Sequence, residues 1–148
     1  MPQYPKLKFP AVVLPIRERE GKTYIPDRVR GGYLVLTPEE WVRRHVIEYL
    51  TNWGGVELQR LITEFPVMLN GQPQRADIVV VDCDGKPQML VECKAAEVEI
   101  TQDVLNQAVR YNSVVGASYL MLTNGLSIFC FEHTKEGEYR KLNTLPQL

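Results

Sequence analysis

The sequence predicts an α/β sandwich with a mixed central sheet, and three observations support this fold class. Apolar residues recur at helical spacing in two segments. Runs rich in Val, Ile and Leu, bounded by turn residues, alternate with these segments. The order is one helix, three meander strands, a second helix and further strands. The second helix must therefore cross over between parallel strands, while short turns join antiparallel ones.

At 148 residues and 45% hydrophobic content, the chain fits one globular domain with its own core. Three short extended stretches near the N-terminus are separated by polar residues and glycines: Pro10–Ile16, Thr23–Pro26 and Tyr33–Leu36. We therefore expect residues 1–36 to form a β extension packed on a core domain of residues 37–148.

The first helix begins at Thr37-Pro38-Glu39-Glu40, which combines an N-cap hydroxyl, Pro at the first helical position and acids in the first turn. It is expected to end at about Asn52, before Gly54-Gly55. Its apolar positions follow helical spacing: Val42, Val46, Tyr49 and Leu50. A second, short helical stretch is expected at Val56–Leu61.

Three strands are predicted next. Ile62–Leu69 ends at Asn70-Gly71, a dipeptide typical of tight hairpins. Arg75–Asp82 and Gln88–Lys94 form a second hairpin around the turn at residues 83–86.

The rest of the chain predicts a crossover helix and three more strands. Thr101 is the expected N-cap of a helix that runs to about Val115. The expected strands are Ser118–Thr123, Leu126–Glu132 and Tyr139–Leu142.

The net charge of −1 provides no general basic field for attracting phosphates. A local basic surface is still compatible with this total, and the expected members are Arg28, Arg30, Arg43 and Arg44. The chain starts without an apolar signal segment and contains no long apolar run. We therefore expect a cytoplasmic protein that does not enter a membrane.

The cysteines and histidines do not show metal-ligand spacing. Cys83, Cys93 and Cys130 fit neither a disulfide framework nor a Cys-x-x-Cys site, which predicts buried, reduced thiols. His45 and His133 are expected to be packing or surface residues.

The register of the second hairpin brings acidic residues together. If Asp84-Gly85 is the turn centre, Asp77 lies opposite Glu92. Lys94 is two residues beyond Glu92 and shares its sheet face, which is also the face of Asp77.

Like charges directly opposed on a sheet are destabilising, so Asp77 and Glu92 need a compensating cation. A divalent metal supplies it, and a neighbouring Lys can stabilise or help to activate an attacking hydroxide. The plainer alternative is a solvated strand face with a cross-strand ion pair. The nearly continuous apolar runs Ile78–Val81 and Met89–Val91 favour the metal interpretation, because they indicate burial on both faces.

These residues carry a family resemblance. Arg75-Ala76-Asp77-Ile78-Val79, followed by Leu90-Val91-Glu92-Cys93-Lys94-Ala95, resembles the PD-(D/E)XK nuclease signature, with Ala76 in place of its Pro. Gln107-Ala108-Val109-Arg110-Tyr111 resembles the Gln-x-x-x-Tyr motif of RecB-type branches, whose spacing places both side chains on one helix face. Thr37–Arg43 resembles the first helix of the N-terminal nuclease domain of type I restriction enzyme R subunits.

The resemblance implies a restriction-endonuclease-like α/β/α sandwich and Mg²⁺-dependent hydrolysis of DNA, with Mn²⁺ as a substitute ion. The implied catalytic residues are Asp77, Glu92, Lys94 and Glu40. The implied metal ligands are Asp77, Glu92 and the backbone carbonyl of Cys93. The implied nucleic-acid contacts are Gln107, Tyr111 and Arg43.

Two acidic positions remain open. Glu40 is preferred to Glu39 as the helix acid of the site, and the alternative is that both acids serve only to favour the helix N-terminus electrostatically. Glu64 is a lesser candidate that would oppose Asp77 from its other side, if residues 72–74 do not lengthen the preceding loop.

The expected partners are DNA, a second copy of the chain for cutting both strands, and restriction-modification subunits. The alternative function is a non-catalytic nuclease-fold module that binds nucleic acid or a restriction-system partner. Every charged member of the signature is present, which argues against this alternative. A purely structural α/β protein ranks last.

Overall fold

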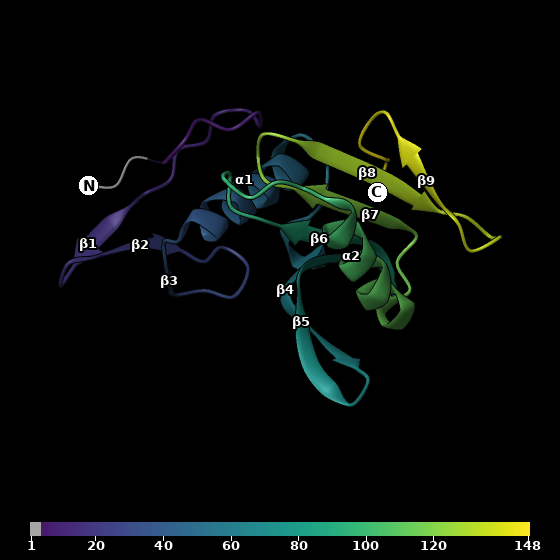
Figure 1. Cartoon of the computed structure of the whole chain (residues 1–148). Coiled ribbons are helices and arrows are strands. Elements are labelled where there is room, and N and C mark those ends of the chain that lie inside the picture. Colours follow the sequence, from purple (N-terminus) through teal and green to yellow (C-terminus); the bar gives the residue numbers. More distant parts are fainter. Residues whose placement is uncertain (1–3) are drawn as a thin grey trace.

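The computed structural model describes residues 4–148 and contains a large sheet, two long helices and a separate small sheet (Figure 1). The small sheet consists of β1 (Arg17–Arg19), β2 (Lys22–Pro26) and β3 (Tyr33–Val35). The elements that follow are α1 (Pro38–Asn52), η1 (Leu58–Arg60), β4 (Leu61–Leu69), β5 (Gln72–Val81), β6 (Pro87–Cys93), α2 (Gln102–Val115), β7 (Tyr119–Thr123), β8 (Ile128–His133) and β9 (Tyr139–Leu142).

The large sheet has six strands in chain order, from β4 at one edge to β9 at the other. Neighbouring strands are antiparallel except β6 and β7, which run parallel because α2 connects them. The predicted α/β class and mixed sheet are therefore confirmed.

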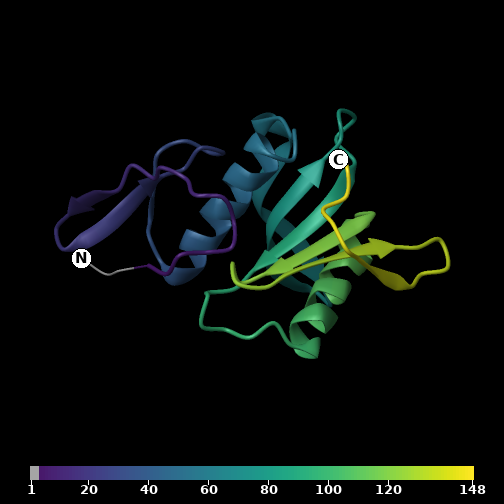
Figure 2. The same cartoon turned by 90° about the horizontal axis from the view of Figure 1, so that it is seen from above.

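The two helices cover opposite faces of the large sheet. Val42 and Val46 of α1 pack in one hydrophobic cluster with Ile78 and Val80 of β5. The alternate residues of the same strand, Val79 and Val81, pack in a second cluster, together with Ala108 and Tyr111 of α2. Because successive side chains of a strand point to opposite faces, the result is a three-layer α/β/α arrangement (Figure 2).

Capping explains where α1 begins and where α2 ends. The Thr37 hydroxyl accepts a hydrogen bond from the Glu40 amide at 3.1 Å, which confirms the predicted start of α1. Thr101 occupies the N-cap position of α2, but its side chain makes no capping hydrogen bond. Gly116 ends α2 with a φ of 75°, a left-handed conformation that Gly adopts without a steric penalty.

Two sequence predictions for the chain outside the large sheet were wrong. Pro10–Ile16 is not a strand, and the polar segment Arg17–Arg19 forms β1 instead. A tight turn explains this, because Glu20 and Gly21 both have positive φ and pair Arg19 with Lys22 across the hairpin. The helical stretch expected at Val56–Leu61 is only the short turn η1.

The cysteines are free thiols, as predicted, and Cys93 and Cys130 are buried. Cys83 is exposed, contrary to expectation, because it lies in the turn between β5 and β6. Within residues 4–148, no helix combines the length and apolar character needed to cross a membrane.

Candidate active site

The β5–β6 pair places the two signature carboxylates side by side. Ile78 pairs with Val91, and continuing this register by one residue sets Asp77 opposite Glu92. The backbone amide of Cys93 donates a hydrogen bond to Asp77 Oδ2 at 2.7 Å. This bond holds the Asp77 carboxylate against the end of β6, directly beside Glu92.

Glu92 is a buried acid, and one of its two carboxylate oxygens lacks a hydrogen-bond partner. Its side chain belongs to a residue only 8% exposed, and Oε1 has no partner among the described residues. Burial, followed by the charge of Asp77, raises the pKa of Glu92 to about 9. Burial likewise raises the pKa of Asp77, against the opposing effect of the Cys93 amide. A solvated strand face, the alternative suggested by the sequence, does not describe Glu92.

Lys94 lies next to this pair and lines a small cavity. Its backbone amide donates to the carbonyl of Thr123 on β7 at 2.9 Å, which fixes the residue just beyond the end of β6. The cavity has a volume of about 120 Å³ and is lined by Glu92, Lys94, Asp103, Val104 and Gln107. Signature residues from β6 and residues from the first turns of α2 thus face the same small space.

Gln107 and Tyr111 form a polar chain along α2. Gln107 Nε2 donates to the Tyr111 hydroxyl at 2.8 Å, and that hydroxyl donates to Gln74 Oε1 on β5 at 3.4 Å. Tyr111 is buried, whereas Gln107 is exposed and borders the cavity. The two motif residues therefore connect the cavity to the β4–β5 hairpin.

Arg43 of α1 binds two further acids. Its Nε donates to Glu40 Oε2 at 2.8 Å, and its Nη1 donates to Glu64 Oε1 at 2.7 Å. Burial of the guanidinium lowers the pKa of Arg43, but hydrogen bonds to Glu40 and Glu64 outweigh this and raise it above the usual range. The guanidinium has a side-chain exposure of 8% and is engaged inside the protein.

Glu64 lies opposite Asp77, as predicted for a hairpin without a lengthened loop. Thr63 pairs with Ile78 and Phe65 with Ala76, so Glu64 falls opposite Asp77, and β5 begins at Gln72 without a longer loop. Glu64 has a φ of 53°, which is unusual for a residue other than Gly and is a strain commonly found at functional sites.

Glu39 lies close enough to Asp77 and Lys94 for their charges to affect it, although the sequence analysis preferred Glu40 as the helix acid of the site. Partial burial, followed by the negative charge of Asp77, raises the pKa of Glu39, while Lys94 and Arg43 oppose this rise. The carboxylate of Glu40, in contrast, is bound by Arg43. Both acids are visible in the sequence at the start of the helix. Which charged groups each carboxylate meets depends on the direction of its side chain, and only the structure shows this.

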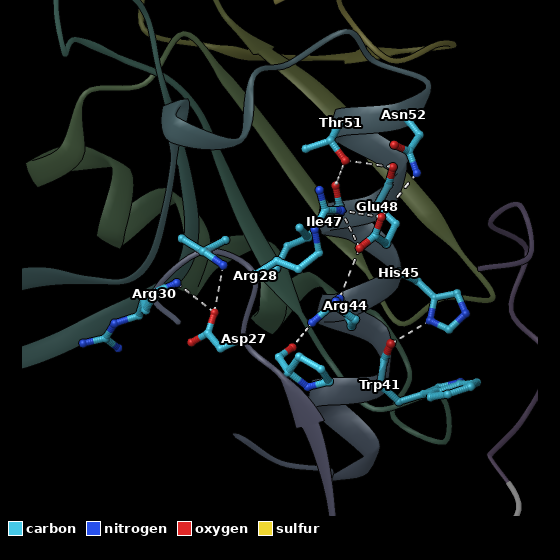
Figure 3. A network of polar contacts seen from close by, with 12 residues as sticks. Asp27, Arg28, Arg30, Trp41, Arg44, His45, Ile47, Glu48, Thr51 and Asn52 are labelled. Atoms are coloured by element: carbon cyan, nitrogen blue, oxygen red, sulfur yellow. Dashed lines mark hydrogen bonds and ion pairs between the residues drawn. The ribbon is translucent and has the colours of Figure 1, made fainter. Parts of the chain in front are cut away.

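The expected basic surface is not present at two of its four positions. Arg43 and Arg44 are buried, and Arg44 Nη1 donates to the carbonyl of Pro26. Figure 3 shows Arg44 and Arg28 converging on Glu48, whose Oε2 lies 2.6 Å from Arg28 Nη1. Both cations join the segment after β2 to α1, and Arg44 is buried, whereas Arg28 keeps a side-chain exposure of 37%.

The two histidines are packing residues, as predicted. His45 Nδ1 donates to the carbonyl of Trp41 at 2.8 Å, and the His45 ring packs edge-on against the Trp41 ring. Burial lowers the pKa of His45. The ring of His133 stacks on Tyr139 with 4.5 Å between centroids.

The residues present fit a hard divalent cation with few protein ligands. Within residues 4–148 no group of three or more His, Cys, Asp or Glu side chains has the arrangement of a metal site. Asp77 and Glu92 are two carboxylates, so backbone carbonyls and water would complete the shell, as is usual for Mg²⁺. The unpartnered Glu92 Oε1 is the observation that supports this fit.

Two solved structures of restriction enzymes are similar to this chain. The fragment structure of a candidate HsdR subunit of a type I restriction enzyme from Vibrio vulnificus YJ016 superposes with a TM-score of 0.58 at 24% identity, over 76% of this chain and 24% of that chain. The type IIG restriction endonuclease BpuSI has a TM-score of 0.44 at 24% identity, over 64% of this chain and 11% of that chain. Identities at this level show the fold alone, and this chain spans about a quarter of the Vibrio chain.

Among curated proteins, none matches this chain. The family model of the type I restriction enzyme R protein N terminus (HSDR_N) matches residues 38–146, which include α1, the complete large sheet and α2. With most of its length covered, this chain belongs to the family of type I restriction enzyme R protein N-terminal domains.

Proposed function

We propose that this chain is the nuclease module of a restriction-system R subunit and that it hydrolyses DNA phosphodiester bonds with Mg²⁺, or with Mn²⁺ as a substitute. The observation that carries the proposal is the buried Asp77–Glu92 pair with its unpartnered oxygen. Two adjacent acids in a poorly solvated site are stabilised by a bound cation far more than exposed acids would be. A DNA-cleaving activity of this kind belongs in the cytoplasm, where the DNA is.

Asp77, Glu92 and the backbone carbonyl of Cys93 would hold the ion. All three supply oxygen ligands: Glu92 and Cys93 end β6, and Asp77 lies beside them in the middle of β5. The bound ion would supply Lewis-acid polarisation of the scissile phosphate and neutralise developing negative charge.

Lys94 has the position for a role in chemistry. It borders the same cavity as Glu92, so its ammonium can donate to an attacking water or to a phosphate oxygen placed there. Gln107, exposed at the cavity and held by Tyr111, would position the substrate strand.

The helix acid of the site is Glu39 rather than Glu40 in this proposal. The charge of Asp77 raises the pKa of Glu39 and the charge of Lys94 lowers it, whereas the Glu40 carboxylate is bound by Arg43. Arg43 is a positioning residue that holds Glu40 and Glu64, because its donors are directed to these acids rather than to solvent.

Mg²⁺ and Mn²⁺ binding by calorimetry, combined with plasmid nicking, tests the proposal. Asp77→Asn should lose metal binding and nicking together, because it removes one charged ligand while keeping the side-chain shape. Asp84→Asn is the matched control, because Asp84 lies in the exposed turn of the same hairpin. A wild-type protein that neither binds metal nor nicks DNA would favour the non-catalytic module.

Lys94→Met separates metal binding from catalysis. We expect the nicking rate at saturating Mg²⁺ to fall on the order of 100-fold, the usual loss when one transition-state donor is removed. The Kd for Mg²⁺ should change only a few-fold, because Lys94 is not a ligand. Equal losses of metal binding and rate would contradict the role given to Lys94.

A further inference from the structure

The β4–β5 hairpin extends beyond the rest of the sheet as a two-stranded ribbon. β5 pairs with β6 only from Ile78 to Val81, whereas its pairing with β4 continues to Gln72 opposite Leu69. The ribbon, defined as residues 65–76, projects away from the body of the molecule (Figure 1). Its five residue pairs span about 15 Å at the usual rise of a strand.

One face of the ribbon is covered and the other is open. Val67 and Ala76 are buried in the cluster that contains Tyr111 of α2, and Gln74 accepts from the Tyr111 hydroxyl. The intervening residues are exposed and point away from α2: Pro66, Met68, Pro73 and Arg75. Met68 is 62% exposed, although it is a large apolar side chain.

The ribbon has the charge of a nucleic-acid contact. No Asp or Glu occurs from Phe65 to Ala76, and Arg75 is its one charged residue. The ion pairs of residues 4–148 do not engage Arg75. Asn70, at the hairpin turn, has an amide side chain of the kind that pairs with base edges, whereas Gln72 and Gln74 lie on the face toward α2. The whole chain has a net charge of −1, whereas the ribbon is positively charged, which favours contact with DNA.

Prolines argue against a protein strand as the occupant. Pro66 lies in β4 and Pro73 in β5, so each strand of the ribbon lacks a backbone N–H donor. Addition of a further strand to either edge would lose hydrogen bonds at these positions.

We propose that the open face of the β4–β5 ribbon inserts into the major groove of duplex DNA and thereby presents one strand to the Asp77–Glu92 site at the ribbon's base. This inference rests on the proposed nuclease function. The major groove, about 12 Å wide, admits a two-stranded β-ribbon, and its thymine methyl groups accept apolar contacts such as Met68. The major groove of A-form RNA is too deep and narrow for a two-stranded ribbon to enter.

Fluorescence anisotropy with a DNA duplex, its single strand and the RNA duplex of the same sequence tests the proposal, with Ca²⁺ in place of Mg²⁺ to suppress cleavage. Arg75→Ala should weaken duplex binding about tenfold. It should also reduce the slope of the logarithm of the binding constant against the logarithm of the salt concentration by about one, because one phosphate contact is lost. Met68→Ser should weaken binding several-fold without changing the salt dependence. Arg140→Ala is the matched control, because Arg140 is an exposed strand arginine on β9 at the opposite edge of the sheet.

The result expected is a preference for duplex DNA that both ribbon variants lose and the control keeps. Wild-type affinity in Arg75→Ala and Met68→Ser, or equal affinity for all three nucleic acids, would overturn the proposal. Nicking by the wild type is scored separately with Mg²⁺. Ribbon-dependent binding without nicking would refute only the nuclease function, and nicking without ribbon dependence would refute only this inference.

Discussion

At the scale of single residues, Glu92 links stability and function. Its carboxyl is buried, faces Asp77 and leaves one oxygen unpartnered. Such an arrangement destabilises the ionised, metal-free protein and favours the proton or the cation that neutralises it. The site is thus expected to sacrifice some folding stability for affinity toward a cation.

The metal-free protein should become less stable as pH rises from about 4.5 to about 9. In the unfolded chain Glu92 titrates at its ordinary value of 4.5, whereas in the folded chain its pKa is about 9. Between these values the folded state binds more protons, so the free energy of unfolding falls with increasing pH. Glu92→Gln should flatten this dependence and raise stability at pH 8, on the order of 2 kcal/mol.

Urea unfolding in EDTA at several pH values measures this effect. Glu136→Gln, at an exposed loop position, is the control and should keep the wild-type profile. An identical pH dependence in wild type and Glu92→Gln would show that Glu92 does not retain its proton in the folded state.

At the scale of elements, the bend in the β4–β5 pair defines the site. Ile78 packs on the α1 side of the sheet, yet Ala76, two residues earlier in the same strand, packs in the cluster of α2. The change occurs at the Glu64–Asp77 position, where Glu64 has positive φ. The ribbon therefore turns over α2 at the point where the acids gather, and Arg43 connects this bend to α1.

Arg43→Met should destabilise the protein by about 3 kcal/mol, because removing one partner of a buried ion network leaves uncompensated charges on the others. Glu40 and Glu64 would then lack their shared guanidinium, and the negative charge of Glu64 acts directly on Asp77. Adding Glu64→Gln should recover part of the loss, which a double-mutant cycle in urea would measure.

Arg140→Ala is a suitable comparison, because its surface pair with Glu132 is expected to contribute less than about 1 kcal/mol. A similarly small effect of Arg43→Met would mean that the bend does not depend on this network.

At the scale of the whole molecule, each chain has one Asp77–Glu92 site, at the base of the β4–β5 ribbon. A single site cuts a single strand, so a double-strand break requires either two chains or two successive events. Closed two-fold assemblies are the commonest way for identical chains to bring two sites together.

Plasmid cleavage at increasing protein concentration tests this pairing. If two chains act together, nicked circles should dominate at low concentration, and the rate of linear product should rise with the square of the concentration. Agarose gels that resolve supercoiled, nicked and linear forms provide the measurement. A linear product whose rate rises only in proportion to protein would indicate that the chains act singly.

Sequence alone determined the elements of the large sheet and most of the register of its hairpins. The exception is a bulge in the β5–β6 pair, where Val81 pairs with Pro87, although a turn centred on Asp84-Gly85 predicts Gln88 as its partner. Val-rich runs, the Asn70-Gly71 and Asp84-Gly85 turns and the Thr37 cap are local signals, and local signals specify period, turn and pairing. The same signals placed Asp77 beside Glu92. They could not identify β1, because the hairpin turn at Glu20-Gly21 lies within a polar segment that resembles a linker.

Tertiary structure alone decided how the charged side chains are used. Arg43 and Arg44 are surface residues by sequence, yet both are buried, because α1 lies between the large sheet and the segment that follows β2. The choice between Glu39 and Glu40 depends on which acid Arg43 engages, and that depends on the position of Glu64 across the bend. The burial and pairing of a charge depend on residues distant in the chain, so they emerge only when the layers are assembled.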